Sequence, residues 1–272
     1  MTLADVVGIE WVGGTSLGTS NRGNPFACPG NGEDEANDYS AVCLGSFTRL
    51  NLDGMVVIGG DGTLAIANKC HQVGMPIVGV PKTIDNDIVG TNSTFGFDTA
   101  VSFATEAVDR LHDTAHAHSR IMVVEVMGRN TGWIALYAGV AGGADVILMA
   151  EIPFDADRVA TAIRRREDRG ARSSIVVVAE GAVGKDGTVS VLDPGGQGRP
   201  ERLGGLGARV AQELEALTGK EARSVVFGHL QRGGVPTRFD RVLATRFGGK
   251  AFELIQRLVF GVMVANRPPN LV

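Results

Sequence analysis

Short apolar runs alternate with longer amphipathic stretches along almost the whole chain. Six runs rich in Val and Ile predict β-strands, at 54–58, 75–80, 120–125, 144–149, 174–179 and 223–227. Between them, apolar residues recur with helical spacing and predict helices at 63–73, 98–114, 131–141, 155–169, 204–217 and 238–257. The strand runs are nearly continuous in apolar residues, which is typical of strands buried on both faces.

This alternation predicts an α/β fold with mainly parallel sheets flanked by helices. Ligands of such folds bind outside the carboxyl ends of the strands, so the segments after each strand are the candidate functional ones. Two stretches rich in Gly, Pro, Asn and Asp, 18–38 and 181–203, predict surface loops.

Composition narrows the class of protein. The 38 glycines among 272 residues predict many tight turns and close backbone approaches. A net charge of −4 gives the chain as a whole no attraction to nucleic acid or to an anionic membrane. No apolar run is long enough to span a bilayer and the start lacks a basic signal-peptide region, so we expect a cytoplasmic protein. The spacing of Cys28, Cys43 and Cys70 predicts free thiols.

The segment Gly59-Gly60-Asp61-Gly62-Thr63 joins a predicted strand to a predicted helix. Its glycines allow backbone N–H groups to approach phosphate oxygens, and the helix turns its positive end toward them. Asp61 adds a carboxylate for a Mg²⁺ ion bound to those phosphates. The alternative is a plain strand-to-helix turn capped by Thr63. We favour the phosphate site. The motif indicates a kinase, but it indicates the substrate of that kinase less well.

The segment PKTIDND at 81–87 follows the next predicted strand. Its two carboxylates, Asp85 and Asp87, suit a site where one accepts a hydroxyl proton while the other organises a metal or partner groups. An Asx-rich turn explains the same spacing equally well. The position of the segment favours the functional interpretation, because both acidic loops follow neighbouring strands and the carboxyl ends of such parallel strands meet at one edge of a sheet.

Six segments together resemble the 6-phosphofructokinase family: GGDGT at 59–63, PKTIDND at 81–87, TFGFDTA at 94–100, SRIMVVEVMGR at 119–129, AEG at 179–181 and GHLQRGG at 228–234. The resemblance runs over nearly the whole chain in the family's order. It implies a two-lobed architecture, with a donor lobe over 1–119, a sugar-phosphate lobe over 120–250 and the start of a return to the first lobe over 251–272.

The resemblance also implies an activity. A homo-oligomeric, Mg²⁺-dependent enzyme would transfer a phosphoryl group from ATP to the 1-hydroxyl of fructose 6-phosphate, giving fructose 1,6-bisphosphate. Asp85 matches the base that takes the hydroxyl proton, with Thr83 and Asp87 beside the reacting centre and Asp61 as the Mg²⁺ ligand. The residues that match the donor-binding set are Arg22, Gly60, Asp61, Gly62 and Thr63.

A second set matches the family's sugar-phosphate site. Arg129 belongs both to this set and to the catalytic one, and Arg120 and Arg223 are supplied by a neighbouring subunit in the family. Besides Thr83 and Asp85, the set consists of Arg120, Met127, Gly128, Arg129, Glu180, Arg223, His229 and Arg232. Guanidinium groups bind phosphate through two parallel hydrogen bonds, which suits these arginines to the role.

The chain departs from the family at its two ends. It lacks the usual first strand and its GGGDxPGLN-like phosphate loop, so we expect a missing central strand and an incomplete nucleoside-triphosphate cradle. The end, GVMVANRPPNLV, stops before the family's last helices. These departures lead us to expect a fragment, a misplaced start codon or a decayed paralogue. Arg22 is displaced by one residue from the family's donor-side turn.

The phosphoryl donor is open between two molecules. In the family, glycine at the position of Gly62 leaves room for a nucleotide, whereas lysine at the position of Lys82 is found in pyrophosphate users. We favour ATP, with pyrophosphate as the alternative donor. A truncated, catalytically silent paralogue that binds sugar phosphate is the other alternative. A lipid or NAD kinase would leave PKTIDND and GHLQRGG unexplained.

Overall fold

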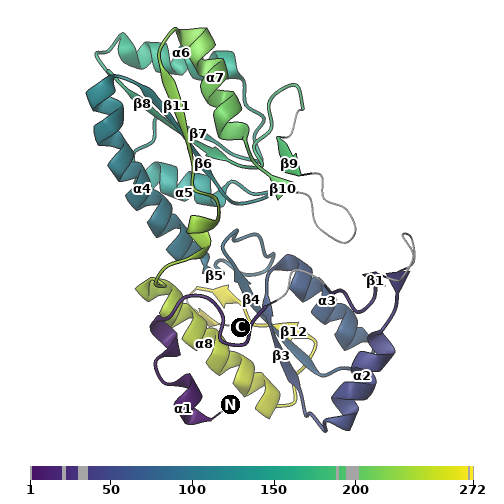
Figure 1. The fold of residues 1–272 in the computed structure, drawn as a ribbon. Helices are drawn as coiled ribbons and strands as arrows, with labels where there is room; N and C mark the ends of the chain where they lie inside the picture. Colours follow the sequence, from purple (N-terminus) through teal and green to yellow (C-terminus); the bar gives the residue numbers. More distant parts are fainter. Residues whose placement is uncertain are drawn as a thin grey trace.

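The computed structural model describes residues 2–19, 23–29, 36–187, 190–193, 202–268 and 270–271. They form two lobes, each built on a parallel sheet with helices against it (Figure 1). The predicted α/β class is therefore confirmed. All six predicted strands and all six predicted helices are present, with shifted ends.

The first lobe contains the sheet β12-β4-β3, in which β5 also pairs with β4. Its strands are β3 (Met55–Gly59), β4 (Ile77–Thr83), β5 (Phe95–Gly96) and β12 (Val262–Met263). The helix α3 (Asp61–Gln72) packs on β3 and β4, and α8 (Arg238–Gln256) packs on the other face of β4 (Figure 1). Val78 and Val80 contact the α8 side, where Phe247 completes a small core.

The second lobe contains the sheet β11-β6-β8-β7, parallel throughout. Its strands are β6 (Ile121–Val126), β7 (Val146–Leu148), β8 (Ser174–Ala179) and β11 (Ala222–Val226). One face is covered by α4 (Phe97–His118) and α5 (Trp133–Ala141), the other by α6 (Ala156–Glu167) and α7 (Leu206–Thr218) (Figure 1). The largest core of the chain surrounds β6 and β8, whose residues are all buried.

The chain crosses between the lobes twice. The helix α4 leads into the second lobe, and the short helix η2 (Gly228–Arg232) followed by α8 leads back (Figure 1). The amino-terminal ends of α4 and α8 therefore both lie at the boundary. The helix α8 packs on β4 through Leu243 and Phe247. The lobe boundaries at 119/120 and 250/251 remain a prediction.

The remaining elements are short. They comprise α1 (Leu3–Val6), η1 (Ile9–Trp11), α2 (Ser40–Arg49), and three antiparallel pairs: β1 (Cys28–Pro29) with β2 (Ala36–Asn37), β9 (Val191–Asp193) with β10 (Arg202–Leu203), and β13 (Asn266–Arg267) with β14 (Asn270–Leu271). The three cysteines are free, as predicted. Among the described helices, none combines the length and the apolar composition needed to cross a bilayer.

The expectation that the strands are buried on both faces is wrong for β3 and β11. In the described part of the chain both are edge strands, and Ile58 and Val226 are 55% and 53% exposed. Ile58 of β3 lies opposite Val80 of β4 in the sheet. The helix α8 packs on Val80 but does not reach as far as Ile58. The apolar runs thus predicted the strands correctly, but they did not show which strands lie at the edge of a sheet.

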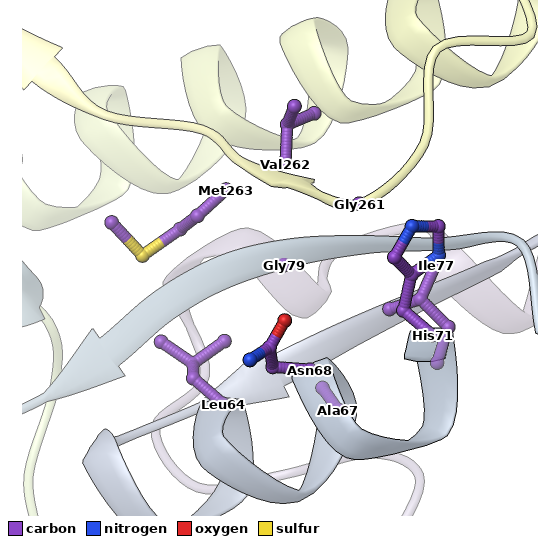
Figure 2. Close-up of a pocket in the computed structure, with 9 residues that line it drawn as sticks. All are labelled: Leu64, Ala67, Asn68, His71, Ile77, Gly79, Gly261, Val262 and Met263. Atoms are coloured by element: carbon purple, nitrogen blue, oxygen red, sulfur yellow. The ribbon is translucent and has the colours of Figure 1, made fainter. Parts of the chain in front are cut away.

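A cavity of about 210 Å³ lies between α3 and the strands β4 and β12. Figure 2 shows Leu64, Asn68 and His71 on α3 beneath the segment that carries Met263. None of the candidate site residues lines this cavity. The candidate chemistry is found instead at the carboxyl ends of the strands.

Candidate active site

The two predicted loops of the first lobe converge. Gly59, the last residue of β3, pairs with Pro81 on β4. A Cβ on Gly60 would lie 3.5 Å from the Thr83 Cβ, and one on Gly59 would lie 2.5 Å from the Thr63 Cβ. The phosphate-type turn is therefore in contact with the PKTIDND loop, and a side chain at position 59 would clash with Thr63 inside the turn itself. Gly62 faces open space.

Three carboxylates crowd this edge of the sheet. Burial raises the pKa of Asp85, the neighbouring Asp87 raises it further, and the positive charge of Arg232 opposes the shift. Burial also raises the pKa of Asp87, and the charge of Asp61 adds to the effect. One oxygen each of Asp85 and Asp87 is buried and has no hydrogen-bond partner among the described residues. A hard cation bound here would relieve both the repulsion and the unmet hydrogen-bonding capacity, so the donor set fits Mg²⁺.

The PKTIDND loop is held by Thr83 and by two side chains that the sequence analysis missed, Asn86 and Thr94. The Asp85 N–H donates to Thr83 Oγ1 at 3.1 Å. Asn86 has a left-handed backbone (φ +53°), and its Oδ1 accepts the Thr94 N–H at 2.9 Å. Thr94, fully buried, donates its hydroxyl to the Thr83 carbonyl at 2.8 Å. The available signal was Asn86, because Asn tolerates the left-handed region better than most residues.

Two turns of the second lobe interlock opposite this loop. Gly128 and Arg129 both have positive φ, +146° and +52°. The Arg129 N–H donates to Glu180 Oε1 at 3.0 Å, and a Cβ on Gly181 would overlap the Arg129 carbonyl oxygen. The MGR and AEG turns identified in the sequence, which include the buried Met127, therefore form one unit.

The two lobes meet between Asp85 and Glu180. The Thr131 hydroxyl of the second lobe donates to the Asp85 carbonyl at 3.0 Å. Burial raises the pKa of Glu180, the N–H groups of Arg129 and Gly128 oppose this, and the charge of Asp85 contributes to the increase. Asp85 and Glu180, the predicted base and the predicted sugar contact, therefore lie close enough for their charges to interact.

Glu125, the next-to-last residue of β6, was also missed. It is only 3% exposed and accepts hydrogen bonds from the N–H groups of Gly207 (2.7 Å) and Gly205 (3.1 Å) at the start of α7. Its carboxylate therefore caps a helix, where free N–H groups stabilise negative charge. A single carboxylate in an otherwise apolar strand was the signal that could have found it.

The helix η2 adds basic residues beside the carboxylates. Burial of part of the Lys82 side chain lowers the pKa of its ammonium group, and Arg232 lowers it further, although Lys82 keeps contact with solvent. His229 lies on the same short helix as Arg232. Lys82, Arg232 and Asp85 therefore form one electrostatic group at the lobe boundary.

Arg120 and Arg223 lie elsewhere. Arg120 immediately precedes β6, and Arg223 pairs with Met122 near the start of that strand. Arg120 Nε contacts Glu221 Oε2 at 2.6 Å, and Arg223 forms an ion pair with the same carboxylate. Within one chain these arginines do not join the residues at the carboxyl ends of the strands. Arg22 lies outside the described residues.

The family model described as phosphofructokinase matches residues 1–255. The chain belongs to the phosphofructokinase family. The resemblance read from the six sequence segments is thereby confirmed.

Curated phosphofructokinases of both donor classes are equally similar to the chain. The ATP-dependent 6-phosphofructokinase of Chloroflexus aggregans is 49% identical over 272 residues, covering 100% of this chain and 74% of that protein. The pyrophosphate–fructose 6-phosphate 1-phosphotransferase of Amycolatopsis methanolica is also 49% identical, covering 99% of this chain and 76% of that protein. Overall identity therefore does not separate the two donors.

Solved phosphofructokinase structures share the fold. The structure of phosphofructokinase from Saccharomyces cerevisiae matches with a TM-score of 0.79 and 28% identity, covering 100% of this chain and 36% of that chain. That of Pichia pastoris phosphofructokinase in the T-state matches with a TM-score of 0.81 and 30% identity, over 100% of this chain and 29% of that one. The two-lobed parallel α/β architecture is thus that of the family.

Proposed function

We propose that this chain transfers a phosphoryl group from ATP to the 1-hydroxyl of fructose 6-phosphate, giving fructose 1,6-bisphosphate. The observation that carries the proposal is the position of Asp85. It lies between the phosphate-type turn of the first lobe, which contacts Thr83, and the Glu180, Arg129 and Arg232 group at the second lobe. A donor on one side and a sugar phosphate on the other would meet at this carboxylate.

Asp85 acts as the proton acceptor. A carboxylate whose pKa is raised by burial is a stronger base than an exposed one, and the charges of Arg232 and Arg129 favour its ionised form. The hydroxyl proton passes to Asp85 as the oxygen attacks the terminal phosphorus and the bond to the leaving phosphate breaks. Thr83 orients the loop through the Asp85 N–H.

The sugar phosphate is held from the second lobe. Glu180 accepts hydrogen bonds from sugar hydroxyls, and Met127 with Gly128 provides the turn against which the sugar packs. His229 and Arg232 bind the 6-phosphate, since a guanidinium group forms two parallel hydrogen bonds with a phosphate. These roles are supported by the electrostatic link from Arg232 and Glu180 to Asp85.

Asp61 and Asp87 would hold Mg²⁺ together with the phosphates of the donor. Within the described residues no group of three or more His, Cys, Asp and Glu could hold a metal alone, which agrees with an ion that keeps phosphate ligands. When bound, the ion would neutralise charge on the transferred phosphoryl group. Gly60, Gly62 and Thr63, with Arg22, would contact the donor.

ATP is the proposed donor because Gly62 faces open space where an inner nucleotide phosphate would pass. One observation favours pyrophosphate as a second candidate: Lys82 places an ammonium group beside Arg232 and Asp85, where it could neutralise a leaving phosphate. Arg120 and Arg223 would serve the site of a neighbouring subunit, so the active form is a homo-oligomer. A cytoplasmic location remains a prediction.

The test is turnover of the purified chain in a coupled assay with fructose 6-phosphate, Mg²⁺ and either ATP or pyrophosphate. Asp85→Asn should lower turnover at least ~100-fold while sugar-phosphate binding persists, because a general base contributes roughly 10²–10⁴-fold. The matched control is Asp113→Asn, at an exposed position of α4, which should keep full activity. Binding of fructose 6-phosphate without turnover by the unmodified chain would instead favour the silent paralogue.

A further inference from the structure

The amino-terminal ends of α4 and α8 exchange side-chain hydrogen bonds at the lobe boundary. Asp240 Oδ2 on α8 accepts from the N–H (2.8 Å) and the hydroxyl (2.5 Å) of Thr99 on α4. Thr237 Oγ1 donates to Asp98 Oδ2 at 2.6 Å, and the Thr237 N–H donates to Thr99 Oγ1 at 3.1 Å. We call Asp98, Thr99, Thr237 and Asp240 the clasp.

The clasp supplies a helix cap that α4 lacks. The N-cap residue of α4 is Gly96, which has no side chain to accept a hydrogen bond. Asp240, 141 positions after Thr99, provides the missing carboxylate. Thr237 is the N-cap of α8 and also accepts the Asp240 N–H, at 3.3 Å. The end of α4 is therefore completed only when α8 lies beside it, whereas α8 carries its own cap.

The clasp is a buried polar structure. Asp240 is 2% exposed, and one of its oxygens has no hydrogen-bond partner in the described part of the chain. A buried carboxylate is costly unless hydrogen bonds or positive charge stabilise it. Here the N–H groups and the positive ends of two helices do so. Such a group fixes the geometry around it, because every displacement leaves a donor or acceptor unpaired.

The segment that carries His229 and Arg232 is fixed to α4 at both ends. We call residues 228–236 the arch. Before the arch, Phe227 packs edge-to-face against Phe103 of α4, with ring centroids 5.6 Å apart. After it, Thr237 is held by the clasp. Between these attachments η2 packs on α4 and Gln231 is buried, but η2 ends at Arg232 and two glycines follow, so the arch after Arg232 leads directly to the clasp.

The same end of α4 is attached to the PKTIDND loop. Gly96, which directly precedes α4, pairs with Thr83 in the β5–β4 ladder. The amino-terminal end of α4 is thus connected both to the loop that carries Thr83 and Asp85 and to the arch.

We propose that the clasp positions His229 and Arg232 relative to Asp85, with Asp98 and Thr237 as positioning residues for the sugar phosphate. The inference rests on the proposed function, in which the arch binds the 6-phosphate. It assigns a role to residues at the lobe boundary that do not themselves reach the reacting atoms.

The test compares two variants that break the same bond differently. Asp98→Ala removes the bond between Thr237 and Asp98 but leaves Thr237 as the cap of α8, whereas Thr237→Val removes both that bond and the cap. Both should raise the KM for fructose 6-phosphate about tenfold, the effect of roughly one hydrogen bond, and leave the KM for the donor within about twofold. Thr237→Ser should restore the wild-type KM.

The matched control is Thr245→Val, which removes an exposed hydroxyl that bonds only within α8 and should change neither KM. A lower melting temperature with an unchanged sugar-phosphate KM would reduce the clasp to a structural role and overturn the proposal. An increase in KM in Thr237→Val alone would assign the effect to the α8 cap and overturn it equally.

Amide hydrogen exchange distinguishes failure of the clasp from failure of the proposed function. In Asp98→Ala, exchange of the peptide spanning 228–237 should be faster than in the wild-type chain, whether or not the chain turns over substrate. Unchanged exchange in that peptide would overturn the clasp. If the wild-type chain shows no turnover, the proposed function fails, and exchange alone then decides whether the clasp holds the arch.

Discussion

Arg120 and Arg129 lie beyond opposite ends of the same strand, β6. The strand runs from Ile121 to Val126, so its six residues separate the two guanidinium-bearing positions by roughly 20 Å of extended backbone. Arg129 joins the candidate active site through Glu180, whereas Arg120 is paired with Glu221 at the other end of the sheet. One fructose 6-phosphate cannot contact both within a single chain.

Sharing of sites between subunits therefore predicts complementation. Asp85→Asn and Arg223→Ala subunits should each be nearly inactive alone. After mixing and subunit exchange in equal amounts, about a quarter of the sites should combine an intact Asp85 with an intact Arg223, if subunits pair at random. The coupled assay measures the recovered activity. Confirmed hybrids that stay inactive would place Arg223 outside the site.

The donor is tested by Gly62→Asp. The structure leaves open space around Gly62, so the new side chain fits without a steric clash and its effect is electrostatic. Like charges about 4 Å apart repel by on the order of 4 kcal/mol at an effective dielectric constant near 20, so ATP turnover should fall by orders of magnitude. Activity with pyrophosphate should persist or appear.

Lys82→Gly is the companion variant for the donor. It removes the ammonium group beside Arg232 and should reduce any activity with pyrophosphate more than activity with ATP. Steady-state kinetics with each donor separate the two effects. An unchanged ATP KM and kcat in Gly62→Asp would show that the nucleotide does not pass this residue.

The raised pKa of Asp85 predicts a stability cost at neutral pH. Because the folded state binds its proton more tightly than the unfolded state, the wild-type chain loses stability as pH rises from the ordinary value of 3.8 through the folded pKa. Asp85→Asn removes this loss, so the variant should be more stable than the wild type at pH 7 while being nearly inactive. Urea denaturation at several pH values measures the difference, which should shrink toward zero in acid. A difference that grows as pH falls would contradict the direction of the shift.

Gly181→Ala tests the interlocked turns of the second lobe. The added Cβ would overlap the Arg129 carbonyl oxygen, so the Arg129 turn must move and the KM for fructose 6-phosphate should rise at least ~10-fold. The matched control is Gly248→Ala, at an exposed position inside α8 with no atoms near the new Cβ. Because alanine is more favourable than glycine inside a helix, this variant should have a free energy of unfolding roughly 0.5–1 kcal/mol higher in urea denaturation. Its kinetics should not change.

The sequence predicted those parts of the site that depend on strand order. Gly60 and Thr83 could be expected to meet because each follows a strand of a parallel sheet, and the family motifs added the matching turns of the second lobe. The buried partners could not be found this way. Thr94 and Asp240 act through contacts 8 to 141 positions apart, and no local pattern reports such distances. Edge strands were missed for a related reason, since an apolar run does not show which helix covers it.

The first sheet is assembled from two distant parts of the chain. Val262 of β12 pairs with Val78 of β4, whereas every strand of the second sheet lies between Ile121 and Val226. During synthesis the second sheet is complete before β12 emerges, and until then β4 has an unpaired apolar edge. Pairings this far apart in sequence raise contact order and slow folding, and open strand edges recruit other chains. We therefore expect the nascent first lobe to associate with other chains more readily than the second lobe does.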